Sequence, residues 1–172
     1  MENAFDVVQP AAQSVLVVDD HPNTAAMLAR AIRTIDLDEP VDVLTAITGE
    51  EALAHSRDRS VEVLIVDYMM PGMNGLDLID ALRAADRLPG HIILISAYSV
   101  LDAELDDREI KIDARFSKPV KTEKILHLVR GLLTDPDTPP AVWLAEEAPV
   151  ERKPNGRPPE ERSTRTAEEN AR

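Results

Sequence analysis

Five polar side chains that could take part in chemistry stand at the ends of short apolar runs: Asp19, Asp20, Asp67, Ser96 and Lys118. The runs before the first four lie at residues 14–18, 61–66 and 92–95. Short apolar runs of this kind predict buried strands. Open α/β sheets place their functional groups at the carboxyl ends of such strands. The sequence therefore predicts one site made of three acids, a hydroxyl and a lysine.

The three carboxylates would repel one another if they converged, and each would raise the pKa of the others. A divalent cation removes this repulsion, and oxygen ligands suit Mg²⁺, which binds one or two carboxylates and keeps several waters. The chain has no cysteine, and the ring of His21 would have to turn back to reach the site. Zinc is therefore the poorer fit.

A carboxylate beside a metal, with a lysine and a hydroxyl opposite, is an arrangement for phosphoryl transfer. Carboxylates act as covalent nucleophiles toward phosphorus. The metal and the ammonium group of Lys118 would neutralise charge on the phosphoryl oxygens, and Ser96 would donate a hydrogen bond to one of them.

The composition limits the class of protein. A chain of 172 residues predicts one domain with an extension. The net charge of −13 does not favour a nucleic acid or an anionic membrane as partner. Residues 1–12 do not resemble a signal peptide, and no apolar run is long enough to span a membrane. We therefore expect a cytoplasmic protein.

Apolar residues alternate between strand-like runs and helix-spaced stripes along residues 13–133. Strands are predicted at 14–18, 41–46, 61–66 and 92–95, with a further short strand ending at Lys118. The first helix is predicted to be capped by Asn23 or Thr24, with Met27 on its apolar face, and the last helix to span 120–133. This alternation predicts a parallel sheet covered by helices on both faces.

The composition changes at residue 134. Residues 134–172 contain seven of the thirteen prolines and nine acids against six bases. This proline-rich, charged tail cannot bury enough apolar surface to fold alone, so we expect it to be disordered. Residues 141–148 could form one helical turn. Residues 1–12 are a short N-terminal extension.

Four motifs together resemble the receiver domain of two-component response regulators. They are Val-Val-Asp-Asp-His-Pro at 17–22, Val-Asp-Tyr-Met-Met-Pro-Gly-Met-Asn-Gly at 66–75, Ile-Ser-Ala at 95–97 and Ser-Lys-Pro at 117–119. The resemblance covers residues 13–133 and implies a flavodoxin-like, doubly wound sheet of five parallel strands in the order 2-1-3-4-5.

The resemblance also implies roles for single residues. Asp67 is implied as the phospho-acceptor, and Mg²⁺ as the cofactor held by Asp19, Asp20, Asp67 and the carbonyl of Met69. Lys118 would pair with Asp67 and then with the phosphoryl group, and Ser96 would be the switch hydroxyl. A cis peptide bond is expected before Pro119. Gly75 is expected to permit the tight loop before the third helix.

One position departs from the family pattern. Three residues before Lys118 the family usually has an aromatic residue, and this chain has Arg115. Alternation should turn the next residue, Phe116, into the core. We therefore expect an electrostatic output surface, in which Arg115 pairs with the acidic segment 102–109.

The function predicted from these features is that of a single-domain receiver that turns over no external substrate. A sensor histidine kinase or a histidine phosphotransfer protein would phosphorylate Asp67, and the phosphorylated chain would change its contacts with a downstream protein. A homodimer through the last helix and the fourth-strand face is an arrangement that these residues allow. The alternative is a DNA-binding or transcriptional regulator that acts through its tail or through an output domain outside this sequence. The sequence does not identify the kinase, the target or the pathway.

Overall fold

The computed structural model describes residues 13–97 and 108–145. Its centre is a sheet of five parallel strands in the order β2-β1-β3-β4-β5. The strands are β1 (Ser14–Val18), β2 (Asp42–Ala46), β3 (Val63–Asp67), β4 (His91–Ser96) and β5 (Ala114–Ser117). The predicted sheet and its strand order are confirmed.

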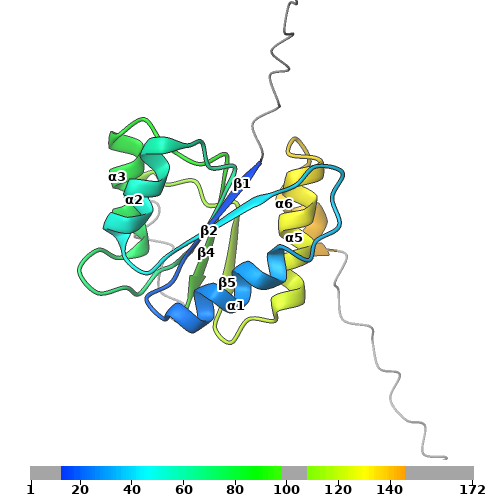
Figure 1. Ribbon diagram of the computed structural model, residues 1–172, viewed down its shortest axis with the longest axis horizontal. Helices are drawn as coiled ribbons and strands as arrows, with labels where there is room; N and C mark the ends of the chain where they lie inside the picture. The colour runs from blue at the N-terminus through cyan, green and yellow to red at the C-terminus, as the bar shows by residue number, and fades with distance from the viewer. Residues whose placement is uncertain (1–12, 98–107, 146–172) are drawn as a thin grey trace, which may run out of the picture.

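Helices cover both faces of the sheet (Figure 1). They are α1 (Pro22–Ile32), α2 (Gly49–Asp58), α3 (Gly75–Ala84), α5 (Thr122–Thr134) and α6 (Pro140–Ala145). Helices α2 and α3 cover one face of the sheet, and α1 and α5 cover the other. In the described ranges, no helix is long and apolar enough to cross a membrane.

Strand periodicity divides the core into two layers. Val63 and Ile65 of β3 pack with buried residues of α1 and α5, whereas Leu64 and Val66 pack with those of α3. Successive residues of a strand point to opposite faces, so β1, β2, β3 and β4 each supply both layers, whereas the apolar residues of β5 belong to the layer of α1 and α5. Burial on both faces also explains why these strands are apolar runs rather than alternating sequences.

Helix α1 differs from the prediction in its N-cap and in its buried face. The N-cap of α1 is His21, followed by Pro22 at the first helical position, rather than Asn23 or Thr24. Proline is favoured at that position, since its missing N–H would lack a partner there anyway. Met27 is 60% exposed, because the buried face of α1 is formed by Ala25, Leu28, Ala29 and Ile32.

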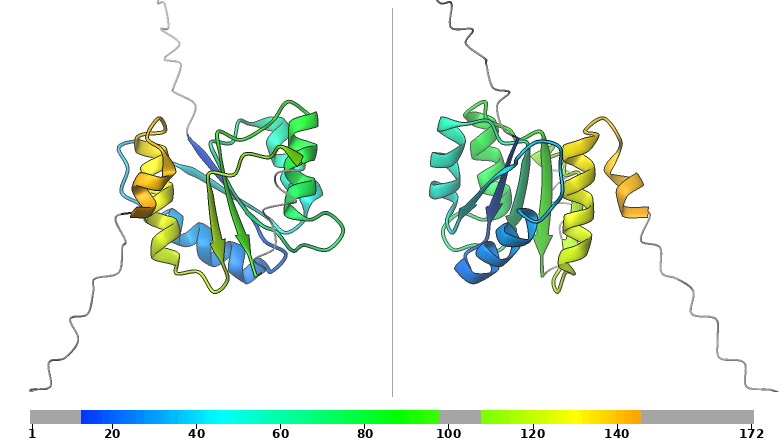
Figure 2. Two further views of the ribbon diagram at one scale, coloured as in Figure 1. Left: turned by 180° about the vertical axis from the view of Figure 1, so that it is seen from behind. Right: turned by 45° about the vertical axis from the view of Figure 1, so that its right-hand side comes forward.

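The chain beyond residue 134 contains more structure than its composition predicts. Helix α5 ends at Thr134, and α6 lies against α5 on the side away from α1 (Figures 1 and 2). A turn with a hydrogen bond from the Thr138 N–H to the Asp135 carbonyl connects the two helices. Helix α6 lies where the sequence allowed one helical turn at 141–148, and residues 146–172 lie outside the described ranges.

Candidate functional site

Strand periodicity places two of the predicted residues on one face of the sheet. Asp67 is the last residue of β3, two residues after Ile65, and Asp19 follows β1 two residues after Val17. Ile65 and Val17 belong to the core layer under α1 and α5. Since side chains two residues apart share a face, both carboxylates lie at the edge of that layer.

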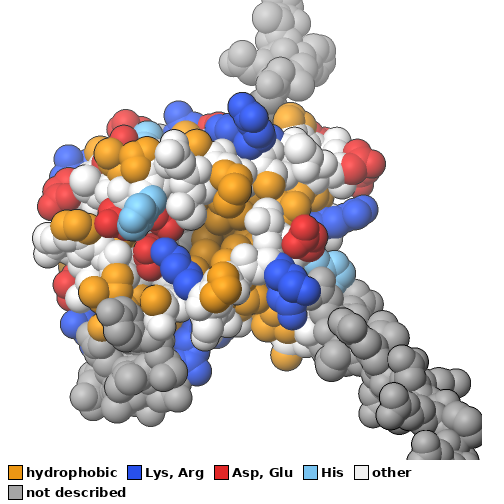
Figure 3. Space-filling model, turned by 90° about the horizontal axis from the view of Figure 1, so that it is seen from below, with side chains coloured by type: hydrophobic (Ala, Val, Ile, Leu, Met, Phe, Trp, Pro, Cys, Tyr) orange, Lys and Arg blue, Asp and Glu red, His pale blue; other side chains and the backbone are white. Residues whose placement is uncertain are grey.

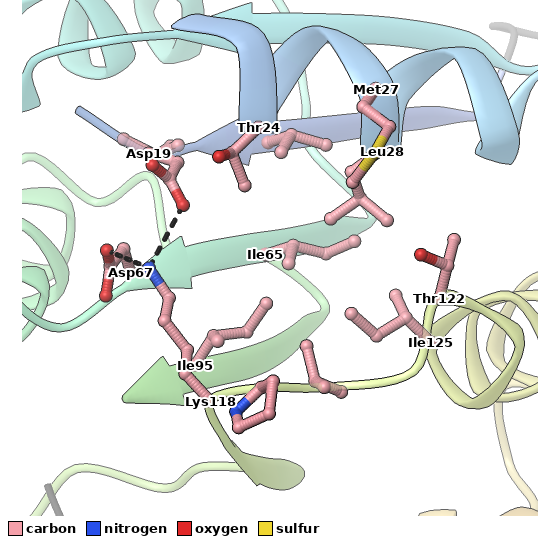
Figure 4. A pocket seen from close by; sticks show the side chains of 14 residues that line it. Asp19, Thr24, Met27, Leu28, Ile65, Asp67, Ile95, Lys118, Thr122 and Ile125 are labelled. Atoms are coloured by element: carbon pink, nitrogen blue, oxygen red, sulfur yellow. Dashed lines mark hydrogen bonds and ion pairs between the residues drawn. The ribbon is translucent and has the colours of Figure 1, made fainter. Parts of the chain in front are cut away.

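The ammonium group of Lys118 joins the two carboxylates. Its Nζ lies 2.5 Å from Oδ2 of Asp67 and 3.3 Å from Oδ2 of Asp19. Figure 4 shows this lysine reaching across the end of β3 from the segment after β5. Asp19 and Asp67 are each only 5% exposed. The predicted meeting of these three side chains is confirmed.

The remaining oxygens of the two buried carboxylates accept backbone hydrogen bonds. Oδ1 of Asp19 accepts from the N–H of His21 at 2.9 Å, and Oδ1 of Asp67 accepts from the N–H of Met69 at 3.3 Å. Each carboxylate is thus held by the loop that follows it and by the shared lysine. These hydrogen bonds and the contact with the lysine fix the orientation of both carboxylates.

The pKa of Lys118 reflects opposing effects. Partial burial of its ammonium group lowers the pKa, but the hydrogen bond to Asp67 and the negative charges of Asp67 and Asp19 outweigh that effect. The pKa of Lys118 therefore lies above its ordinary value. The two carboxylates therefore keep the lysine protonated and positively charged at neutral pH.

Asp20 and Ser96 lie at the same end of the sheet. The side chain of Asp20 is 24% exposed, and its Oδ1 lies 3.0 Å from Nδ1 of His21. Ser96 ends β4 and is 5% exposed. Its carbonyl accepts a hydrogen bond of 2.8 Å from the Lys118 N–H, so the backbone ties the serine to the lysine.

Two proline and glycine positions shape the site. The peptide bond between Lys118 and Pro119 is cis, as predicted. Gly75 is needed for a different reason from the predicted one. A Cβ at Gly75 would lie 2.6 Å from the carbonyl oxygen of Asp67, so glycine permits the close approach of α3 to the backbone of Asp67.

A cleft of about 480 Å³ opens beside the acids, between α1 and α5. Its floor is apolar and consists of Val17, Ile65, Ile95 and Ile125, among others. In Figure 3 the hollow shows this apolar floor, and in Figure 4 Asp19, Asp67 and Lys118 stand at one end of it. The sequence did not predict this cleft. The small side chains of Thr24 and Thr122 line it.

Arg115 is exposed on β5, and Phe116 is partly buried against the core layer of α1 and α5. The predicted alternation of this strand is therefore confirmed. The predicted pairing of Arg115 with the acidic segment 102–109 falls mostly on residues 98–107, outside the described ranges. Within the described part of that segment, Arg108 forms ion pairs with Asp77 and Asp80 of α3, which the sequence analysis missed.

The residues that could hold a metal ion include one that the sequence analysis set aside. Ligand atoms of Asp19, Asp20 and His21 all lie within 4.8 Å of one another. The oxygen donors fit Mg²⁺. The signal for His21 was its position directly after the two acids, followed by a proline.

The model of the response regulator receiver domain family matches residues 15–130. Over 133 residues the chain is 32% identical to the DNA-binding response regulator MtrA of Mycolicibacterium smegmatis, which covers 77% of this chain and 56% of the relative. Over 121 residues it is 32% identical to the probable transcriptional regulatory protein TcrX of Mycobacterium tuberculosis, covering 70% and 49%. The chain thus spans about half the length of these curated relatives.

Solved structures agree with this assignment. The response regulator TrrA from Thermotoga maritima, in complex with Mg²⁺ and BeF, is 28% identical with a TM-score of 0.57, covering 70% of this chain and 98% of that one. A Francisella response regulator receiver domain has a TM-score of 0.61 at 22% identity, covering 73% and 99%, and supports the fold. The family model, the relatives and the geometry of the site agree: the chain belongs to the receiver domain family of two-component response regulators.

Proposed function

We propose that Asp67 accepts a phosphoryl group from a sensor histidine kinase or a histidine phosphotransfer protein in a Mg²⁺-dependent reaction. The observation that carries the proposal is the contact of Asp67 with Lys118, 2.5 Å apart at the end of β3. A carboxylate can act as a nucleophile toward phosphorus. The ammonium group beside it is already in place to neutralise the negative charge of the phosphoryl oxygens.

The proposed reaction moves one phosphoryl group. A carboxylate oxygen of Asp67 attacks phosphorus, the bond from phosphorus to the donor's imidazole nitrogen breaks, and the electron pair of that bond stays on the nitrogen. Lys118 lies within reach of the new phosphoryl oxygens and exchanges its contact with Asp67 for one with them. When bound, Mg²⁺ neutralises negative charge shared by the acids and the phosphoryl oxygens.

Three acids would supply the protein's part of the Mg²⁺ site in this proposal, with the carbonyl of Met69. Asp19 and Asp67 are buried and positioned by backbone hydrogen bonds, and Asp20 is the more exposed partner. Lys118 engages Oδ2 of both buried acids, which leaves their other oxygens for a cation. The donor set is therefore consistent with Mg²⁺.

The proposed output is a change in protein contacts at Ser96 and Arg115. Ser96 is buried at the end of β4 and linked through its carbonyl to Lys118, so a movement of the serine and of the lysine would be coupled. Arg115 is exposed on the edge strand β5. The chain would exchange between two conformations, and a ligand shifts such an equilibrium by the difference in its affinity for the two. The phosphoryl group on Asp67 would act as that ligand. The chain would catalyse only its own phosphorylation and dephosphorylation.

The test is incubation of the full chain with Mg²⁺ and acetyl phosphate, followed by intact mass measurement. We expect a mass increase of one phosphoryl group that requires Mg²⁺ and is absent from Asp67→Asn. Asp58→Asn is the control, because Asp58 lies at the end of α2 and is exposed. An unmodified wild-type chain, or an adduct that persists in Asp67→Asn, would refute the proposal.

The names of the relatives favour a second candidate, a regulator that binds DNA. The test is binding of the full chain to duplex DNA at low and at physiological salt, with and without acetyl phosphate. Binding that weakens with salt and disappears when residues 150–172 are deleted would support DNA contact through the tail. Equal and negligible binding in all samples would exclude it for this chain.

A further inference from the structure

The ring of His21 lies against the two acids that precede it in the sequence. Its Nδ1 is 3.0 Å from Oδ1 of Asp20 and 3.4 Å from Oδ1 of Asp19. The side chain is 73% exposed, yet this one nitrogen faces the acid site. The ring is therefore exposed over most of its surface, but its Nδ1 contacts the two acids.

The local backbone explains this position. His21 precedes Pro22, which restricts the residue before it to extended conformations, and His21 has φ −94° and ψ 104°. The N–H of His21 donates to Oδ1 of Asp19 at 2.9 Å. This hydrogen bond holds the histidine backbone next to the carboxylate, and the contact of the ring with Asp20 keeps the ring on the same side.

The distances from the ring nitrogen of His21 to the two carboxylate oxygens are compatible with a coordinated ion. At a metal–ligand distance of about 2.1 Å, two ligands at a right angle are about 3.0 Å apart, and two ligands at a tetrahedral angle are about 3.4 Å apart. The two distances from Nδ1 to the carboxylate oxygens, 3.0 and 3.4 Å, equal these values. The same spacing also serves a hydrogen bond from an Nδ1–H to Asp20, so the metal would replace that proton.

The charges around this point favour a cation. Lys118 contacts Oδ2 of Asp19, whereas His21 faces Oδ1 of the same carboxylate. One lysine stands against the three acids Asp19, Asp20 and Asp67, so the site retains an excess of negative charge. Oδ1 of Asp19 and Oδ1 of Asp20 are the two carboxylate oxygens that lie nearest to the ring of His21.

We propose that His21 is a metal ligand together with Asp19 and Asp20, so that this site binds Zn²⁺ or a similar divalent transition ion in addition to Mg²⁺. Imidazole nitrogen suits zinc, nickel and copper, whereas Mg²⁺ prefers oxygen. In the bound form the neutral ring carries its proton on Nε2 and ligates through Nδ1. This inference rests on the proposed role of Asp19 and Asp20 in metal binding.

The experiment is calorimetric titration of the full chain with zinc chloride and with magnesium chloride. His21→Gln removes the imidazole, and His55→Gln is the matched control because His55 lies on α2, away from the acids. We expect His21→Gln to lower the Zn²⁺ affinity about tenfold or more and to leave the Mg²⁺ affinity within about twofold. His55→Gln should bind both ions as the wild type does, and Asp20→Asn should lower the affinity for both Zn²⁺ and Mg²⁺.

A second readout identifies the ligand atom directly. In a chain labelled with ¹⁵N-histidine, the Nδ1 resonance of His21 should shift on addition of Zn²⁺ and not on addition of Mg²⁺. Wild-type Mg²⁺ binding with a Zn²⁺ affinity that His21→Gln does not change would overturn this inference alone. Absence of Mg²⁺ binding in the wild type would instead overturn the proposed function. A loss of Zn²⁺ affinity of equal size in His55→Gln would also count against a site at His21.

Discussion

Lys118 and Asp67 form an ion pair of 2.5 Å between Nζ and Oδ2 at the carboxyl end of β3. The same nitrogen lies 3.3 Å from Asp19. The ammonium group of Lys118 therefore occupies the position between the two buried acids that would also attract a metal ion. In the proposed reaction its charge would neutralise the phosphoryl oxygens, and the same charge would compete with a metal ion for the two acids.

Replacing Lys118 with methionine should strengthen Mg²⁺ binding while slowing phosphorylation. Methionine fills a similar volume without the charge, so the acids regain an unshared negative charge. We expect the Mg²⁺ affinity to rise about fivefold, equivalent to about 1 kcal/mol, in a calorimetric titration. Phosphorylation by acetyl phosphate should become slower, because no ammonium group neutralises the phosphoryl oxygens. Lys121→Met, at the exposed N-cap of α5, should leave both measurements unchanged, and weaker Mg²⁺ binding in Lys118→Met would contradict the competition.

The raised pKa of Lys118 predicts a loss of stability at alkaline pH. The folded chain holds this proton more tightly than the unfolded chain, so the stabilisation is complete below the ordinary lysine pKa of about 10.4. It is lost as the pH rises through the higher pKa of the folded state. Urea unfolding from pH 9 to pH 11.5 (values spanning roughly the titration range of lysine) should show this loss. Asp67→Asn should reduce it, and an equally steep loss in that variant would assign the effect to other groups.

The sheet and the positions of its functional residues could be predicted because they depend on strand periodicity. Val17 and Asp19 share a face, as do Ile65 and Asp67, and any parallel sheet that buries the apolar partners must bring the acids together. Strand pairing places β4 beside β3 and β5 beside β4, which brings Ser96 and Lys118 to the same edge of the sheet.

Features that depend on contacts between loops could not be predicted in the same way. The close approach of Gly75 to the Asp67 carbonyl is a property of two backbone segments in space, and only the presence of a glycine hinted at it. The position of His21 depends on the hydrogen bond of its backbone N–H to Asp19 and on the contact of its ring with Asp20. Helix α6 has six residues, and helices this short need tertiary packing, so the contact with α5 decides its existence rather than composition.

Gly75 and Gly49 form a matched pair for testing the close approach. Each is the first residue of its helix, so alanine gives both helices the same gain in intrinsic propensity. A Cβ at Gly49 would meet Sδ of Met73, the end of a flexible side chain, whereas a Cβ at Gly75 would meet the Asp67 carbonyl oxygen. Urea unfolding should show Gly75→Ala losing about 1–3 kcal/mol relative to Gly49→Ala. Phosphorylation should also slow in Gly75→Ala alone, and equal behaviour of the two variants would show that the backbone can shift without cost.

Arg108 links the segment before β5 to α3. Its Nη1 lies 2.8 Å from Asp77 and 3.0 Å from Asp80, and Arg83 of α3 donates hydrogen bonds of 3.1 Å to the carbonyls of Arg108 and Glu109. Glu109 has a φ of 52°, in the left-handed region that few residues other than glycine adopt. The cluster therefore holds a sharply turned backbone against α3.

Replacing Arg108 with alanine should destabilise the chain by a modest amount that depends on salt. The side chains of Arg108, Asp77 and Asp80 are 29%, 42% and 38% exposed, and exposed ion pairs contribute little each, so we expect a loss of about 0.5–1.5 kcal/mol at low salt. The loss should shrink at about 1 M salt, where screening acts over about 3 Å. Urea unfolding at both salt concentrations measures it, and a double-mutant cycle with Asp77→Ala isolates the pair. Arg87→Ala, at an exposed position after α3, should show neither effect. A loss in Arg108→Ala that is independent of salt would indicate that the stem of the arginine, rather than its charge, holds the turn.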